Sequence, residues 1–175
     1  MLDEISDLEN KVGLPHNFIH QLTAEDDWSF VIKLNALFEA ASTHLITSKL
    51  NVPELEDNLS YIDFGNSKFG KVALLKKLKC INTDEAKFLQ MLFELRNKLA
   101  HNISHVNFNF DSYLSGMDSN QKKSFVKAVK CGNEMIFWNC EDQPREKFVL
   151  SHPKILVFLT ASQILVSMHM QTVSK

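Results

Sequence analysis

The spacing of apolar residues between positions 31 and 46 constrains the fold of this chain more than any other feature. Apolar side chains recur there at intervals of three and four, at Val31, Leu34, Leu37, Phe38, Ala41, Leu45 and Ile46. This interval places them on one face of a helix, whereas a half-buried strand requires strict alternation. The 175 residues include five Gly and four Pro, too few for the many tight turns of an all-β sandwich. The sequence therefore predicts an all-α fold with a single domain over residues 1–175.

Start and stop signals divide the chain into a bundle of five to six helices with antiparallel neighbours. Thr23 is the predicted N-cap of the long second helix, and Asn82 with Thr83 is predicted to cap the fourth. Residues 51–66 are predicted to form a connector with at most one short helical turn, and residues 104–117 a loop. The predicted helices cover residues 2–12, 24–50, 67–79, 83–103, 119–131 and 153–171.

Residues 132–151 carry the weakest secondary-structure signal. The pairs of apolar residues at 137–138 and the run at 148–150 are predicted as two short strands or extended covers over the core. Ser151 is the predicted cap of the final helix, and Pro153 fits its first turn because that position needs no backbone N–H.

The overall charge gives no global attraction for nucleic acid, since the formal net charge is −2 and the pI is about 6.4. Two groups of lysines are predicted to be solvated helix faces, with a local nucleic-acid patch as the alternative. They are Lys68, Lys71, Lys76, Lys77 and Lys79, and then Lys122, Lys123, Lys127 and Lys130. The sequence has no helix-turn-helix with a basic recognition helix, so sequence-specific DNA binding is not expected.

Cysteine and histidine spacing gives no reason to expect a metal or a cofactor. The three cysteines form no CxxC motif and are predicted to be reduced thiols of a cytoplasmic protein. His101 and His105 are four residues apart, but no Glu completes an HExxH motif and His105 falls past the predicted helix end. The N-terminus lacks an apolar signal segment, and the apolar run 155–170 is predicted to be too short and too polar to cross a membrane.

The most compact set of catalytic side chains lies near the end of the fourth predicted helix. At about 100° per residue from Phe88 on the core face, Arg96 lies about 80° away, at the edge of the core. Asn97 and His101 lie at about 180° and 220°, so both point away from the core, and their spacing of four lets their side chains touch. An arginine at a core edge requires a carboxylate, and Glu39 in the long helix is the predicted partner.

An arginine, an amide and a histidine in this arrangement can bind a phosphate, orient it and move a proton. Each residue taken alone also fits a structural role. An arginine at a core edge commonly forms an ion pair, and a histidine near a helix C-terminus is favoured by the negative end of the helix dipole. The spacing of Arg96, Asn97 and His101 together is more specific than any one of them.

The segment Arg96-Asn97-x-x-x-His101 resembles the signature of the HEPN superfamily (higher eukaryotes and prokaryotes nucleotide-binding). That signature is an arginine followed by a polar residue and, a little more than one helical turn later, a histidine. The final helix from Pro153 is similar to the closing helix of the same fold. Residues 34–102 are also similar to the mannitol operon repressor family, a helical branch of the superfamily. The matching positions are Leu37-Phe38-Glu39-Ala40, Gly70, Val72, Leu75 and Ile81.

The resemblance implies a metal-independent endoribonuclease that acts as a two-fold homodimer, with Arg96, Asn97 and His101 of both subunits lining one cleft. His101 would be the general base on the ribose 2′-hydroxyl or the general acid on the leaving oxygen, and Arg96 would stabilise charge on the phosphate. Other members of the superfamily have lost activity, so the alternative is a non-catalytic binding or regulatory protein, either an immunity protein that neutralises a toxin or a transcriptional co-regulator. The expected partners are a second copy and either RNA or a protein toxin or antitoxin.

Overall fold

The computed structural model describes residues 2–131 and 145–173, and every regular element in these two ranges is helical. This part of the chain contains ten α-helices and three 3₁₀-helices, which confirms the all-α prediction. Five α-helices have ten or more residues and form the framework. They are α1 (Leu2–Lys11), α3 (Asp27–Leu50), α6 (Thr83–Ala100), α8 (Ser119–Val129) and α10 (Pro153–Val173).

Short helices account for the difference from the predicted bundle of five to six helices. The short α-helices are α2 (Phe18–Gln21), α4 (Glu56–Ser60), α5 (Lys71–Lys77), α7 (Phe110–Ser115) and α9 (Arg145–Ser151). The 3₁₀-helices are η1 (Leu22–Ala24), η2 (Pro53–Leu55) and η3 (Ile103–Asn107).

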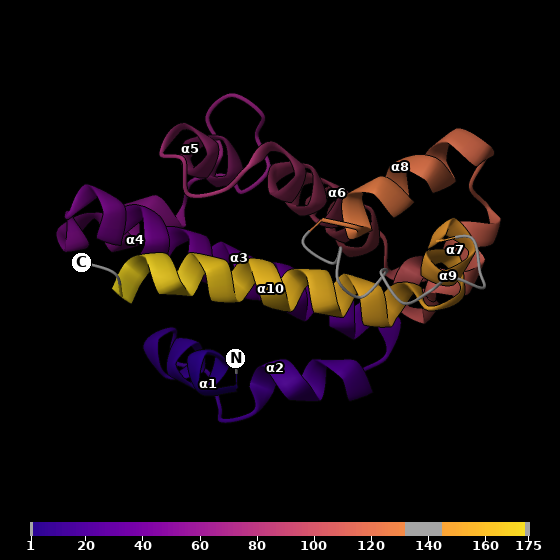
Figure 1. Ribbon diagram of the computed structural model, residues 1–175, viewed down its shortest axis with the longest axis horizontal. Coiled ribbons are helices and arrows are strands. Elements are labelled where there is room, and N and C mark those ends of the chain that lie inside the picture. Colours follow the sequence, from indigo (N-terminus) through magenta and orange to yellow (C-terminus); the bar gives the residue numbers. More distant parts are fainter. Residues whose placement is uncertain (1, 132–144, 174–175) are drawn as a thin grey trace.

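Helix α3 is the central element, and it packs against both α10 and α6. Figure 1 shows α10 running along α3, with α1 and α2 on one side and α5, α6 and α8 on the other. Buried rings join α3 to α6 and to α7. Phe38 of α3 meets Phe88 of α6 edge-on with 6.3 Å between ring centroids, and Phe30 meets Phe110 of α7 at 6.2 Å.

The two predicted connectors contain more helix than the sequence indicated. Residues 51–66 include η2 and α4, and residues 104–117, predicted as a loop, include α7 and most of η3. The side-chain oxygen of Asn109 accepts a hydrogen bond from the Ser112 backbone N–H at 2.8 Å and so caps α7. The loop prediction is wrong here because asparagine is common both in loops and at helix N-caps.

Two predicted boundaries of the long helices are also wrong. Helix α3 begins after Asp26, whose carboxylate accepts a hydrogen bond from the Ser29 backbone N–H at 2.9 Å, and not after Thr23. Helix α6 ends at Ala100, so His101 is its C-cap residue and not part of its last turn. The predicted capping of α6 by Asn82 is confirmed.

The predicted helix over residues 67–79 is shorter in the structure, because α5 begins only after Gly70. The preceding turn brings Gly70 so close to the backbone of Asn66 that a Cβ atom at Gly70 would lie 2.6 Å from the Asn66 nitrogen. Only glycine therefore fits this approach.

Residues 145–151 form α9, which contradicts the strand predicted at 148–150. Ser151 ends this helix and does not cap α10, as the sequence had suggested. The apolar pair predicted as a strand at 137–138 lies outside the described residues.

Helix α10 spans 21 residues and is long and apolar enough to cross a membrane by length and composition alone, which corrects the prediction that this segment is too short and too polar. Half of the apolar window is buried inside the protein. Leu156, Ala161 and Leu165 of this helix belong to the core, as expected of a central helix that passes the same test.

Candidate functional site

Helix α6 carries the residues that the sequence singled out, and it is fixed at both ends. Asn82 and Glu85 form a reciprocal capping box at its start. Near its end, the Trp28 indole N–H reaches the Leu99 carbonyl oxygen at 3.5 Å. In the middle, the buried Asn35 amide of α3 donates to the Leu92 carbonyl at 3.1 Å. These contacts hold the register of α6 against α3 and thereby set where Arg96 lies.

Arg96 lies at the edge of the core, and the predicted ion pair with Glu39 is confirmed. The distance between Arg96 Nη2 and Glu39 Oε1 is 3.8 Å, and the two side chains are 36% and 34% exposed. Asn97 Oδ1 accepts a hydrogen bond from Arg96 Nη1 at 3.0 Å. The guanidinium is therefore oriented by two partners, while about a third of the Arg96 side chain remains open to solvent.

Asn97 and His101 do not form the outward pair that the helical wheel suggested. The Asn97 side chain turns toward Arg96, so it has a partner within its own chain. His101 is exposed, its backbone N–H donates to the Asn97 carbonyl at 3.2 Å, and its imidazole makes no hydrogen bond or ion pair within residues 2–131 and 145–173. The imidazole is thus accessible for binding or proton transfer.

Arg96 and His101 point in different directions within one subunit. Five residues at about 100° each separate their directions around α6 by about 140°. No hydrogen bond or ion pair joins the two side chains in the described residues. One copy of the chain therefore does not direct both groups at the same atom.

Lys71 is a charged residue near Arg96 that the sequence analysis misassigned. It was predicted to lie on a solvated helix face, but its residue is only 2% exposed and its Nζ donates to the Ser60 carbonyl at 3.0 Å. Burial lowers the pKa of this amine, and the charges of Glu39 and Asp63 partly oppose the shift. Glu39 therefore faces two cations, the Arg96 guanidinium and the buried Lys71 ammonium. The local pattern that indicated this burial was the flanking of Lys71 by the close-packed Gly70 and the buried Val72.

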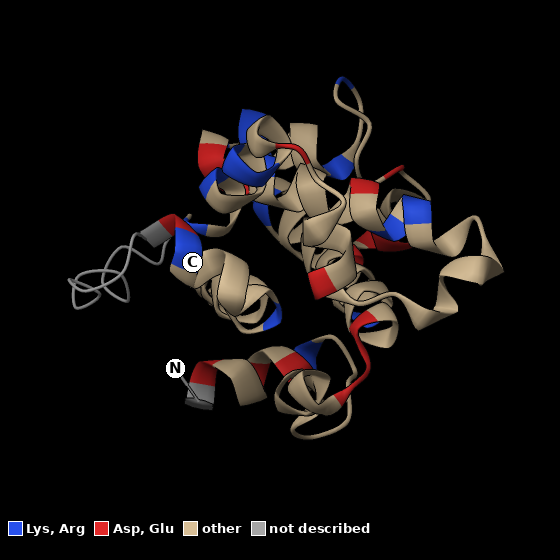
Figure 2. Ribbon diagram, turned by 90° about the vertical axis from the view of Figure 1, so that its right-hand side faces the viewer, with Lys and Arg blue, Asp and Glu red and all other residues tan. Residues whose placement is uncertain are grey.

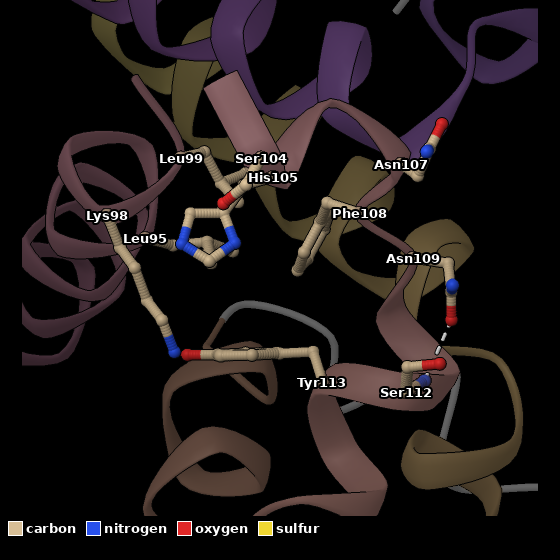
Figure 3. Close-up of a pocket in the computed structure, with 10 residues that line it drawn as sticks. All are labelled: Leu95, Lys98, Leu99, Ser104, His105, Asn107, Phe108, Asn109, Ser112 and Tyr113. Carbon is tan, nitrogen blue, oxygen red and sulfur yellow. Dashed lines mark hydrogen bonds between the residues drawn. The ribbon is translucent and has the colours of Figure 1, made fainter. Parts of the chain in front are cut away.

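A pocket of about 300 Å³ lies beyond the end of α6, enclosed by residues of α6, η3 and α7. Figure 3 shows the His105 ring, the Lys98 amine and the Tyr113 hydroxyl directed into it, with Phe108 forming one wall. The floor includes the buried residues Leu95 and Leu99. Arg96, Asn97 and His101 do not line this pocket. The sequence pattern suggests a role only for His105, as a metal ligand that lacks partners, because the pocket residues converge only through the fold of η3 and α7.

Positive and negative residues are interspersed over the molecule. Figure 2 shows Lys and Arg positions lying among Asp and Glu positions and not gathered into one large basic surface. Among the residues that the structure describes, no group of three or more His, Cys, Asp or Glu side chains is arranged to hold a metal ion.

Comparison of the chain with protein-family models, with curated proteins and with solved structures gives no match.

Proposed function

We propose that this protein is a metal-independent endoribonuclease of the HEPN type that acts as a homodimer. The observation that carries the proposal is the orientation of the Arg96 guanidinium by Asn97 and Glu39 in a side chain that remains about a third exposed. An exposed imidazole follows at His101, the C-cap residue of the same helix, and it has no side-chain partner among the described residues. Cleavage of a phosphodiester requires an oriented cation and an accessible acid–base group, and α6 supplies both, one at Arg96 and the other at His101.

The proposed reaction is a transesterification within RNA. A neutral His101 imidazole accepts the proton of the ribose 2′-hydroxyl, and the 2′-oxygen attacks the adjacent phosphorus. The bond from phosphorus to the 5′-oxygen breaks, and the same imidazole, now protonated, donates this proton to the 5′-oxygen. The products are a 2′,3′-cyclic phosphate and a 5′-hydroxyl. Arg96 stabilises the negative charge that builds on the phosphate oxygens during the attack.

The divergence of Arg96 and His101 supports a dimeric site. Because these side chains leave α6 about 140° apart, a phosphate that contacts Arg96 of one copy is better placed for His101 of a second copy. A two-fold axis beside the C-terminal end of α6 brings two such complementary pairs together. The helix end is suited to this, since His101 is exposed there.

The test is cleavage of single-stranded RNA in the presence of a chelator. Arg96→Ala and His101→Ala should each reduce the rate by at least ~100-fold, the usual contribution of an acid–base group or of a charge-stabilising donor. His16→Ala, which removes another exposed histidine, is the matched control and should retain full activity. Intact RNA at high concentrations of folded wild-type protein would refute the catalytic proposal.

Mixing the two inactive variants tests the shared site. A dimer formed from one Arg96→Ala chain and one His101→Ala chain retains one intact site only if the arginine and the histidine come from different subunits. Random exchange of subunits makes about half of the dimers mixed, each with one intact site of two, and should then restore about a quarter of the wild-type activity. No recovery in a mixture that is demonstrably dimeric would mean that both groups act from the same chain.

A second function is favoured by the ion pair itself. Glu39 already neutralises much of the charge of Arg96, as it would in a structural pair at a core edge. On this alternative the protein is a non-catalytic binding or regulatory protein, such as an immunity protein or a co-regulator. Pull-down with the product of the neighbouring open reading frame distinguishes the two, since an immunity protein should bind such a toxin tightly and remain able to do so after His101→Ala.

A further inference from the structure

Two neighbouring cavities meet at Lys98 and Tyr113, away from Arg96 and His101. The first is the pocket of about 300 Å³ formed by α6, η3 and α7, called here the η3 pocket. The second is a groove of about 840 Å³ between α6, α7 and α8, called here the α8 groove. Lys98, Ser112 and Tyr113 line both, so the two spaces adjoin across these side chains.

Three polar side chains at the η3 pocket have no hydrogen-bond acceptor among the described residues. Lys98 Nζ lies 5.4 Å from the centre of the Tyr113 ring, and within residues 2–131 and 145–173 it forms no ion pair. The His105 ring and the Tyr113 hydroxyl likewise have no side-chain hydrogen-bond partner in the described residues. Figure 3 shows these three groups around one space. An ammonium, an imidazole and a phenol together offer the donors that a phosphate group accepts.

Neighbouring rings hold the Tyr113 side chain in place. Its ring meets Phe108 edge-on at 5.6 Å between centroids, and Phe108 meets Phe110 in the same way at 5.3 Å. Burial and the charge of Glu94 raise the pKa of the Tyr113 hydroxyl, which therefore stays protonated and remains a donor at neutral pH.

The distribution of acidic side chains indicates which of the two cavities binds the phosphate. Glu94 lines the α8 groove, where its carboxylate accepts a hydrogen bond from Gln90 at 3.0 Å, but it does not line the η3 pocket. Among the described residues, no Asp or Glu lines the η3 pocket. Because the charge of Glu94 also reaches the Tyr113 hydroxyl, a phosphate is favoured on the side of the η3 pocket that faces away from the α8 groove.

The α8 groove can accept the uncharged part of such a ligand. Met91, Met117 and Phe125 supply an apolar surface, and Asn120 and Gln121 lie among the polar residues that line the same space. This combination is typical of small-molecule sites, and the volume falls within their usual range of about 300–1,000 Å³.

We propose that the η3 pocket and the α8 groove together bind a small organic phosphate, with its phosphate at Lys98, His105 and Tyr113 and its body in the α8 groove. The site is separate from the proposed nuclease reaction, because Arg96, Asn97 and His101 line neither cavity. Its success or failure therefore leaves the nuclease proposal unaffected. The phosphate is the shared chemistry, and the body is either a nucleoside or a sugar.

Calorimetric titration of the full chain with adenosine 5′-monophosphate, glucose 6-phosphate and inorganic phosphate tests this inference, with adenosine and glucose as counterparts that lack the phosphate. We expect one of the two organic phosphates to bind at least ~10-fold more tightly than its counterpart and than inorganic phosphate, and the better of the two identifies the body. No binding by either organic phosphate, or equal binding of a ligand and its counterpart, would overturn the proposal.

Variants locate the binding and separate it from a general effect of charge. Lys98→Gln and Tyr113→Phe each remove one donor and should weaken binding about tenfold, while Tyr113→Phe keeps the ring that packs on Phe108. Lys123→Gln, which removes an exposed lysine outside both cavities, is the control and should leave the affinity unchanged. An equal loss in the control variant would show attraction by net charge alone and would overturn the site. Thermal unfolding of each variant confirms that it is folded.

Discussion

Replacement of Glu39 by Ala should destabilise the protein by about 2 kcal/mol, and most of this cost should come from Lys71 rather than from Arg96. The Arg96 pair is long, at 3.8 Å, and about a third exposed, so it contributes about 0.2–1 kcal/mol. Lys71 is only 2% exposed. The Glu39→Ala substitution removes a negative charge that stabilises the ammonium form of Lys71. Glu39 acts on this ammonium through its charge, while Asp63 and the Ser60 carbonyl remain in the variant, so we expect its removal to cost about 1–2 kcal/mol.

Urea unfolding at pH 7 measures this cost, and repeating it in a Lys71→Met background assigns it. Without the buried ammonium, Glu39→Ala should cost less than ~1 kcal/mol, because only the exposed Arg96 pair is lost. The Arg96→Ala background is the matched comparison and should leave most of the cost in place. An equal cost in the wild-type and Lys71→Met backgrounds would refute the reasoning, since it would mean that Glu39 does not support the buried lysine.

Three further predictions concern stability. Glu9→Ala should cost about 2–3 kcal/mol in chemical unfolding, because the buried Glu9 carboxylate accepts the backbone N–H groups of Asn17 at 2.9 Å and Ile19 at 2.8 Å; a cost below ~0.5 kcal/mol would contradict this. Asn82→Ala should lower the free energy of unfolding by about 1 kcal/mol because it removes the capping box of α6, whereas Asn82→Asp should keep most of this stability because aspartate also caps helices. The pKa of Lys71 is lowered from 10.5 by burial, so between its folded value and 10.5 the unfolded chain binds more protons and stability rises with pH. The free energy of unfolding of the wild type relative to Lys71→Met should therefore rise with pH toward 10.5, and a difference that stays constant would contradict the burial of a charged amine.

The part of the site that the sequence predicted correctly depends on helix geometry alone. A rotation of about 100° per residue places Arg96 at the edge of the core once Phe88 is known to face inward, and an edge guanidinium needs a carboxylate from the neighbouring helix. Glu39 fulfils that role. The same reasoning misplaced the Asn97 side chain, because a side chain at one helical position can turn toward the residue beside it when that residue offers a hydrogen bond.

The parts that the sequence did not predict depend on how short segments fold back. Lys71 is buried by the turn at Gly70 and by the Ser60 carbonyl, a contact between segments whose sequences suggest only a connector and a basic helix. The η3 pocket requires Asn102 and Asn109 to cap η3 and α7, where asparagine equally suggests a loop. Periodicity is informative over the long helices, but a four- to seven-residue helix contains too few positions to reveal a face.

Glu39 also provides the experiment that separates the two functions proposed for the Arg96 site. If Arg96 binds a phosphate, the Glu39 carboxylate competes with that phosphate for the guanidinium, and Glu39→Gln should strengthen RNA binding. An exposed pair worth about 0.2–1 kcal/mol corresponds to a decrease in KM of up to about fivefold. If Arg96 is structural, the same substitution only lowers stability and leaves any RNA interaction unchanged. The proposal is therefore tested by measuring both the KM for RNA cleavage and the midpoint of urea unfolding. A loss of stability with no change in KM would mean that Arg96 does not belong to the catalytic site.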